Sequence, residues 1–146
     1  MLSENLKVLL ATSYAFVIKA QNFHWNVEGP DFPQYHEFFG DLYAEVYGVL
    51  DKIAEYIRTL DSYTPGSFER YAELSVIQGQ TKIPRAELMF QEILDDNQKL
   101  IEVLKNCFEV AGQEREFGIE NFIAERLDAH AKHAWMLKSI LKRERS

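Results

Sequence analysis

The sequence predicts an all-α protein, a four-helix bundle that forms one domain over residues 1–146. Four long segments place apolar side chains three and four residues apart, which is the spacing that lines one face of an α-helix. No segment alternates apolar and polar residues as a half-buried strand does. Because a chain of 146 residues can bury a core of its own, the four helices are expected to pack around a single core.

The first two long helices are separated by a glycine-proline turn. The first helix is expected to begin near Ser3, whose hydroxyl can cap it, and to end at Gly29–Pro30. Asp31 is the expected N-cap of the second helix, which continues without a break to Leu60. Its buried stripe is Tyr35, Phe39, Leu42, Val46, Val49, Ile53, Tyr56 and Leu60.

The second half of the chain holds one short helix and two more long ones. Residues 61–66 contain a proline and a glycine and break the chain, and residues 67–74 are expected to form a short helix in the connection. The third long helix should cover residues 84–111, with Gly112 as its C-terminal cap. The fourth should cover residues 116–141.

The second long helix carries more apolar surface than one bundle needs. Beside its buried stripe runs another, made of His36, Gly40, Tyr43, Tyr47, Leu50, Ala54 and Ile57. A helix at the surface of a bundle needs only one such stripe, and a large exposed apolar patch marks an interaction site. We therefore expect a subunit interface on this helix.

The charge balance of the chain is acidic. Its formal net charge is −7 and its pI is near 5.1, a balance that suits cations better than nucleic acid or an anionic membrane. The single cysteine, Cys107, excludes an internal disulfide framework and fits a reducing cytoplasm. No signal peptide begins the chain, and the apolar run at residues 8–18 is too short to cross a bilayer. We expect a cytoplasmic protein without a membrane partner.

Candidate metal ligands gather in the first two helices. His24 ends the first apolar pattern and His36 opens the second, which also carries Asp51 and Glu55. A spacing of four places these two carboxylates on one face of a helix. Imidazole and carboxylate together suit iron, manganese or zinc better than calcium or copper(I).

Helix geometry separates the two kinds of ligand. His36 and Asp51 are fifteen residues apart, which is roughly 22 Å along a continuous helix. One chain therefore cannot place both on the same ion. Either each pair is a separate half-site, or two copies of the helix run antiparallel across a two-fold axis and complete each other's sites. We favour the second arrangement, with histidines from one chain and carboxylates from the other.

Several motifs in the chain resemble those of a known family. They are FHWNV-x-G-x-x-F-x-x-x-H from Phe23, D-x-x-x-E from Asp51, SFERYAEL from Ser67 and H-x-K-x-x-WML from His130. This pattern is similar to that of the Dps family, the mini-ferritins of bacteria, and it covers nearly the whole chain. The resemblance implies a ferritin-like four-helix bundle with a short extra helix between the second and third long helices.

The resemblance also implies an activity, that of a ferroxidase and iron store. Fe(II) would bind His24 and His36 of one subunit with Asp51 and Glu55 of its partner, be oxidised there preferably by hydrogen peroxide rather than O₂, and pass as Fe(III) mineral into a dodecameric shell. Such a protein protects against oxidative stress. The iron could form a di-iron site, and Zn²⁺ could substitute for it. Trp25 resembles the family tryptophan that quenches stray oxidising equivalents, and a packing role for its ring is the alternative.

The resemblance implies roles for two further sets of residues, in mineral nucleation and in iron entry. The acids Glu37, Asp41 and Glu45 repeat every fourth residue, and family shells line their cavity with such acids to nucleate ferric mineral; a simple solvated face is the alternative. Family shells also admit iron through acid-lined three-fold pores near the start of the last helix. The matching positions here are Glu116, Asn121, Glu125 and Asp128.

One position of the iron site departs from the family pattern. Many Dps proteins have an aspartate four residues after the second histidine, where it serves the weaker iron position, and here that residue is Gly40. Asp41 points about 100° away around the helix. We expect one firm iron position per site and a second that is weak, completed by water or differently liganded.

The basic residues of the chain give little support to DNA binding. Family members that coat DNA often use a lysine-rich mobile tail, whereas here the basic end is Lys138, Lys142, Arg143 and Arg145. Twelve chains of charge −7 would carry about −84, which repels phosphate. We do not expect DNA binding, and nucleoid association in a bacterial cytoplasm stays open. The alternative function is a DNA-protecting or stress scaffold with a weak metal site.

His130 and His133 are a separate pair on the last helix. Di-iron sites inside ferritin-like bundles use Glu-x-x-His motifs, and this chain contains none. We therefore expect these histidines to pack or hydrogen-bond rather than to bind metal.

Overall fold

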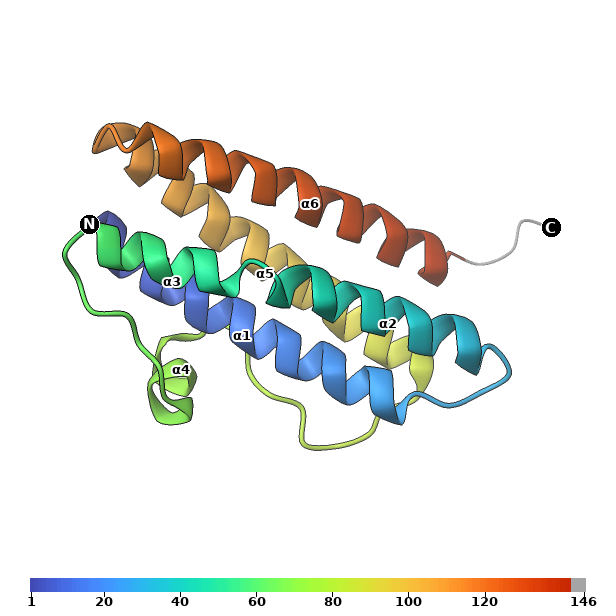
Figure 1. Ribbon diagram of the computed structural model, residues 1–146. Helices are drawn as coiled ribbons and strands as arrows, with labels where there is room; N and C mark the ends of the chain where they lie inside the picture. Colours follow the sequence, from blue (N-terminus) through green and yellow to red (C-terminus); the bar gives the residue numbers. More distant parts are fainter. Residues whose placement is uncertain (143–146) are drawn as a thin grey trace.

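The computed structural model describes residues 1–142 and contains six helices. They are α1 (Leu2–Asn26), α2 (Phe32–Tyr47), α3 (Leu50–Thr59), α4 (Phe68–Leu74), α5 (Ala86–Gln113) and α6 (Phe117–Leu141). Three long rods are α1, α5 and α6, and α2 with α3 makes the fourth (Figure 1). No strand occurs within the described residues, so the predicted all-α four-helix bundle is confirmed.

Aromatic and aliphatic side chains of the long helices fill the core of the bundle. Phe16, Phe23, Phe39 and Phe90 are fully buried. The Phe39 and Phe90 rings stack at 4.5 Å between centroids, and Phe23 meets Phe39 edge-on at 5.8 Å. These rings join α1, α2 and α5, so the predicted buried stripe of the second helix does face the core. Within residues 1–142 no helix is both long enough and apolar enough to span a bilayer.

The second rod is interrupted where an unbroken helix was expected. The interruption lies at Gly48 and Val49, where the Val49 N–H donates to the carbonyl of Val46, three residues back, at 3.2 Å. Figure 1 shows α3 continuing from α2 past this point. Glycine is a poor helix former because it has more backbone freedom to lose. The prediction of one continuous helix to Leu60 is therefore wrong, and Asp51 lies in the first turn of α3.

The short helix α4 lies in the connection between α3 and α5, as the family resemblance implies. The Ser67 hydroxyl accepts a hydrogen bond from the Arg70 N–H at 3.2 Å and caps it. The Tyr71 ring stacks on Tyr14 of α1 at 4.7 Å between centroids. Figure 1 shows α4 set outside the bundle, next to α1. The short helix thus adds an aromatic contact to the outer side of α1.

The end of α5 differs from its prediction. Gly112 lies inside the helix, which continues to Gln113, and the residue in the left-handed conformation is Arg115, with φ 59°. A Cβ on Gly112 would lie 2.6 Å from Oε2 of Glu120. Gly112 therefore leaves room for the Glu120 carboxylate of α6 and is not the C-terminal cap.

Candidate metal centre

His24 and His36 are joined by reciprocal hydrogen bonds across the α1–α2 turn and form a pair, the histidine clasp. The Nδ1 of each ring lies 2.6 Å from the backbone carbonyl of the other residue, and the rings stack at 3.8 Å between centroids. A carbonyl only accepts hydrogen bonds, so both Nδ1 atoms carry the proton. Each Nε2 therefore keeps a free lone pair, and its ring orientation is set by a backbone partner, as is typical of metal-binding histidines.

Gly40 makes room for this clasp. A Cβ at position 40 would lie 2.8 Å from Cε1 and 3.0 Å from Nδ1 of His24. Any larger side chain on Gly40 would have to move the His24 imidazole, which is held by its hydrogen bond to the His36 carbonyl. The glycine, which departs from the pattern that the resemblance implies, thus has a structural role, because the ring of His24 fills the space that a side chain on residue 40 would need.

Two aromatic side chains contact the histidine pair. Phe32 stacks on His36 at 5.1 Å between centroids, and Tyr43 meets His24 edge-on at 5.5 Å. Trp25 is 65 % exposed. Its ring therefore does not pack in the core of its own chain, and it lies on the surface next to His24.

The carboxylates Asp51 and Glu55 lie on α3 and are both exposed. Asp51 lines a surface pocket of about 200 Å³ together with Tyr14, Tyr47 and Tyr71. Among residues 1–142 no three His, Cys, Asp or Glu side chains lie close enough together to share a metal ion. The structure therefore does not bring the histidine pair and the carboxylate pair together within one chain.

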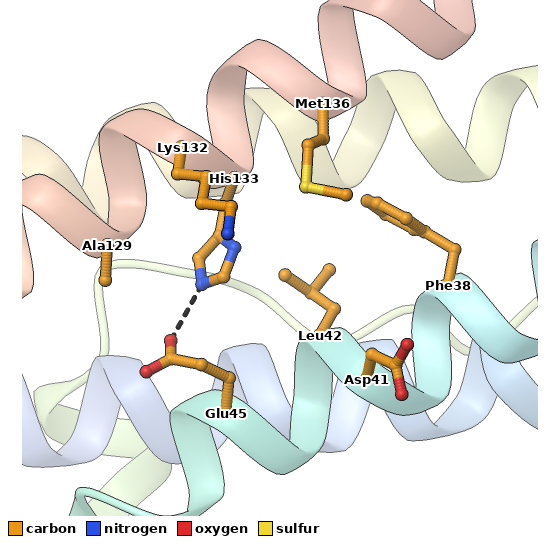
Figure 2. A pocket seen from close by; sticks show the side chains of 8 residues that line it. All are labelled: Phe38, Asp41, Leu42, Glu45, Ala129, Lys132, His133 and Met136. Atoms are coloured by element: carbon orange, nitrogen blue, oxygen red, sulfur yellow. Dashed lines mark hydrogen bonds and ion pairs between the residues drawn. The ribbon is translucent and has the colours of Figure 1, made fainter.

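A second polar cluster lies between α2, α5 and α6. Arg126 donates two hydrogen bonds to the carboxylate of Glu45, at 2.5 and 2.9 Å, and His133 Nε2 lies 2.7 Å from the same carboxylate. Figure 2 shows His133 reaching from α6 towards Glu45 on α2. His130 lies 3.1 Å from Arg126 through its Nε2 and 2.7 Å from the Asn97 side chain through its Nδ1. The hydrogen-bonding role predicted for His130 and His133 is confirmed.

The environment of this cluster shifts two pKa values. Burial would raise the pKa of Glu45, but the hydrogen bonds from His133 and Arg126 and the charge of Arg126 hold that pKa well below its usual value. Burial lowers the pKa of His130 to about 3, with help from the charges of Arg126 and His133. Glu45 is therefore ionised and His130 neutral near pH 7.

The acids predicted to nucleate mineral do not share one environment. Glu37 and Asp41 are exposed, whereas Glu45 is half-buried and already ion-paired with Arg126. Two of the three carboxylates are thus available to cations from solvent. The predicted pore residues of α6 are Asn121, Glu125 and Asp128, all exposed, and Glu116 precedes the helix. A three-fold pore needs three chains, so the pore stays a prediction. The role of Glu37, Asp41 and Glu45 in mineral nucleation also stays a prediction.

Comparison with known proteins decides the family. A ferritin-like domain model matches residues 3–146. The chain is 33 % identical over 123 residues to "DNA protection during starvation protein 2" of Bacillus anthracis, covering 84 % of each chain. The chain is a ferritin-like protein of the Dps family.

Solved Dps structures agree with this assignment. The crystal structure of Dps from Staphylococcus aureus matches with a TM-score of 0.94 and 30 % identity, over 98 % of this chain and 96 % of that one. Dps from Vibrio cholerae, described as a member of a superfamily of ferritin-like diiron-carboxylate proteins, matches with a TM-score of 0.93 and 27 % identity, over 97 % and 89 %. The Dps fold thus accounts for the whole described chain.

Sequence reasoning missed two features of this region. One is the reciprocal hydrogen bonding of His24 and His36, which depends on how the turn after α1 returns the chain. The other is the pairing of Glu45 with Arg126, residues 81 positions apart. For the histidine pair, the local signal in the sequence was Gly40, one turn after His36. A glycine inside a helix indicates that a neighbouring group approaches the backbone closely.

Proposed function

We propose that this protein is a ferroxidase and iron store, which oxidises Fe(II), preferably with hydrogen peroxide, at sites between two-fold related subunits and keeps Fe(III) mineral inside a dodecameric shell. The observation that carries the proposal is the histidine clasp, because it presents two Nε2 lone pairs at one end of the α2–α3 rod while two exposed carboxylates lie on α3. An antiparallel partner would bring one pair to the other.

The donor set suits the proposed substrate. The Nε2 atoms of His24 and His36 bind Fe(II) well, whereas the hard carboxylate oxygens of Asp51 and Glu55 favour the ferric product. Two Fe(II) ions supply the two electrons that reduce one peroxide to water, so peroxide is consumed without releasing hydroxyl radical. Because Gly40 offers no carboxylate, the second Fe(II) would be held weakly and exchange readily. Zn²⁺ would compete for the same ligands.

Carboxylate substitution tests this proposal. Fe(II) is added without oxygen, peroxide follows, and the iron oxidised per peroxide is counted. We expect about two Fe(II) per peroxide in the natural protein and at least a tenfold slower reaction in Asp51→Ala/Glu55→Ala, since electrostatic and ligand contacts of this kind contribute several kcal/mol. The matched control is Glu69→Ala/Glu73→Ala, which removes an exposed acid pair of the same spacing from α4. Unchanged oxidation in the first variant would place the chemistry elsewhere.

DNA protection is the second candidate, and the name of the Bacillus anthracis relative favours it. The acidic charge of −7 per chain opposes it. A gel shift with duplex DNA at low and moderate salt separates the two, because a complex held by phosphate contacts must weaken steeply as salt rises. We expect no shift at either salt concentration without bridging cations.

A further inference from the structure

The buried Arg126 occupies a position that resembles a metal site. Its Nη2 lies 2.9 Å from Oε1 of Glu45 and 3.1 Å from Nε2 of His130. His133 Nε2 lies 2.7 Å from the same Glu45 oxygen, and the two imidazole rings are 5.2 Å apart. One carboxylate and one imidazole thus contact the guanidinium, and a second imidazole contacts the same carboxylate oxygen. The arginine is only 6 % exposed and His130 only 2 %, so this charge sits inside the bundle.

The protonation of His130 follows from its neighbours. The Asn97 amide nitrogen donates to the backbone carbonyl of His130 at 3.0 Å, which turns the Asn97 oxygen towards His130 Nδ1. That oxygen only accepts, so Nδ1 carries the proton and Nε2 directs its lone pair at the guanidinium. A metal-binding histidine is oriented in the same way, with one nitrogen donating to a fixed oxygen and the other facing the cation.

We infer that Arg126 fills a latent divalent-metal site made of Glu45, His130 and His133, and that its guanidinium keeps the interior of the bundle free of metal. A carboxylate with two imidazoles is a ligand set that zinc and related transition ions accept. The guanidinium is tethered to the chain and hydrogen-bonded to Glu45, so an ion from solution cannot readily displace it. Among residues 1–142 no three His, Cys, Asp or Glu side chains lie close enough together to hold an ion, so Glu45, His130 and His133 would have to close around one once the guanidinium is removed.

The latent site is reachable from the surface. Glu45 and His133 line a pocket of about 440 Å³ between α2 and α6, whose other walls include Asp41, Leu42 and Met136 (Figure 2). Shortening Arg126 would extend this pocket inward to His130. An ion entering the pocket would then meet the carboxylate of Glu45 and the ring of His133 first.

Cobalt binding tests the inference separately from the proposed function. The background is His24→Ala/His36→Ala, which removes the histidines proposed to bind iron between subunits. In this background Arg126→Ala should bind one additional Co²⁺ per chain, with the strong visible absorption of a tetrahedral site that contains nitrogen ligands. Adding His130→Ala should weaken that binding at least tenfold. Arg58→Ala, which removes an exposed arginine instead, should bind no additional ion.

Thermal unfolding keeps the test decisive if Arg126→Ala folds poorly. In the same His24→Ala/His36→Ala background, Zn²⁺ should raise the Tm of Arg126→Ala and leave that of Arg126→Ala/His130→Ala unchanged, because only the first chain retains the complete ligand set. A folded Arg126→Ala that binds no additional Co²⁺ would overturn the inference. So would binding that does not depend on His130, or a chain that stays unfolded with Zn²⁺ present.

Discussion

At the scale of single residues, Gly40 shows how one missing side chain shapes the proposed site. A Cβ added to residue 40 would lie 2.8 Å from Cε1 of the His24 ring. We expect Gly40→Ala to displace this ring, break its hydrogen bond to the His36 carbonyl and weaken Zn²⁺ binding about tenfold, as the loss of an orienting contact does at other metal sites. Calorimetric titration measures the affinity.

The control for Gly40→Ala is a helical glycine with space around it. Gly118 on α6 has no atom within 4 Å of an added Cβ, so Gly118→Ala should leave the affinity for Zn²⁺ unchanged. Equal affinities in Gly40→Ala and the natural protein would mean that the orientation of His24 does not matter for binding.

His130 should make the free energy of unfolding depend on pH. Its pKa is near 3 in the folded chain and about 6.5 when unfolded. The unfolded chain therefore binds more protons between these values, and stability is lost as the pH falls through this window, by up to about 1.4 kcal/mol per pH unit. Urea unfolding at pH 6.5, 5.5 and 4.5 measures the slope, which should become smaller in His130→Gln.

Glu45→Gln is the matching control for the pH dependence of the free energy of unfolding. The pKa of Glu45 is lowered, so its contribution is present above its unfolded pKa and is lost as the pH falls through about 4.5 and below. Between pH 6.5 and 5.5 the slope should therefore respond to His130→Gln and hardly at all to Glu45→Gln. An unchanged slope in His130→Gln would show that another group binds the proton.

At the scale of helices, the chain's local patterns and its long-range contacts differ in what they reveal. Apolar spacing predicted the four rods because each pattern is repeated many times along a segment, whereas the short helix was expected in the connection that follows the break at residues 61–66. The helix ends near Gly48 and Gly112 were predicted poorly, since one glycine can break a helix, cap it or admit a neighbour. The residue types of the proposed iron ligands were visible in sequence, but the Glu45–Arg126 pair was not, because it exists only after α2 and α6 pack together.

A buried ion pair also joins α1 to α5. Lys19 Nζ lies 2.6 Å from Asp96 and 3.2 Å from Glu92, and both Lys19 and Asp96 are nearly inaccessible to solvent. We expect Lys19→Met to lower the free energy of unfolding by about 3–5 kcal/mol, because Asp96 would then be a buried charge without its partner. Urea unfolding at neutral pH measures this loss.

The double variant distinguishes the pair from its packing. Lys19→Met/Asp96→Leu removes both charges and should regain most of the stability, since a buried ion pair and an apolar pair of similar volume are often equivalent. Lys7→Met, which removes a lysine paired with the exposed Glu4, should change stability by less than about 1 kcal/mol. A double variant as unstable as Lys19→Met would indicate that packing, and not charge, causes the loss.

At the scale of the whole assembly, the proposed site requires that subunits share ligands, and mixing two inactive chains tests this requirement. His24→Ala/His36→Ala lacks the imidazoles and Asp51→Ala/Glu55→Ala lacks the carboxylates, so neither should oxidise Fe(II) alone. If histidines of one chain face carboxylates of its two-fold partner, each mixed pair has one complete site and one without any ligand. Equal, random assembly makes half of the pairs mixed, and about a quarter of the natural activity should return. Chains that assemble separately before mixing should regain none, and a coassembled shell without activity would mean that two-fold partners do not complete each other's sites.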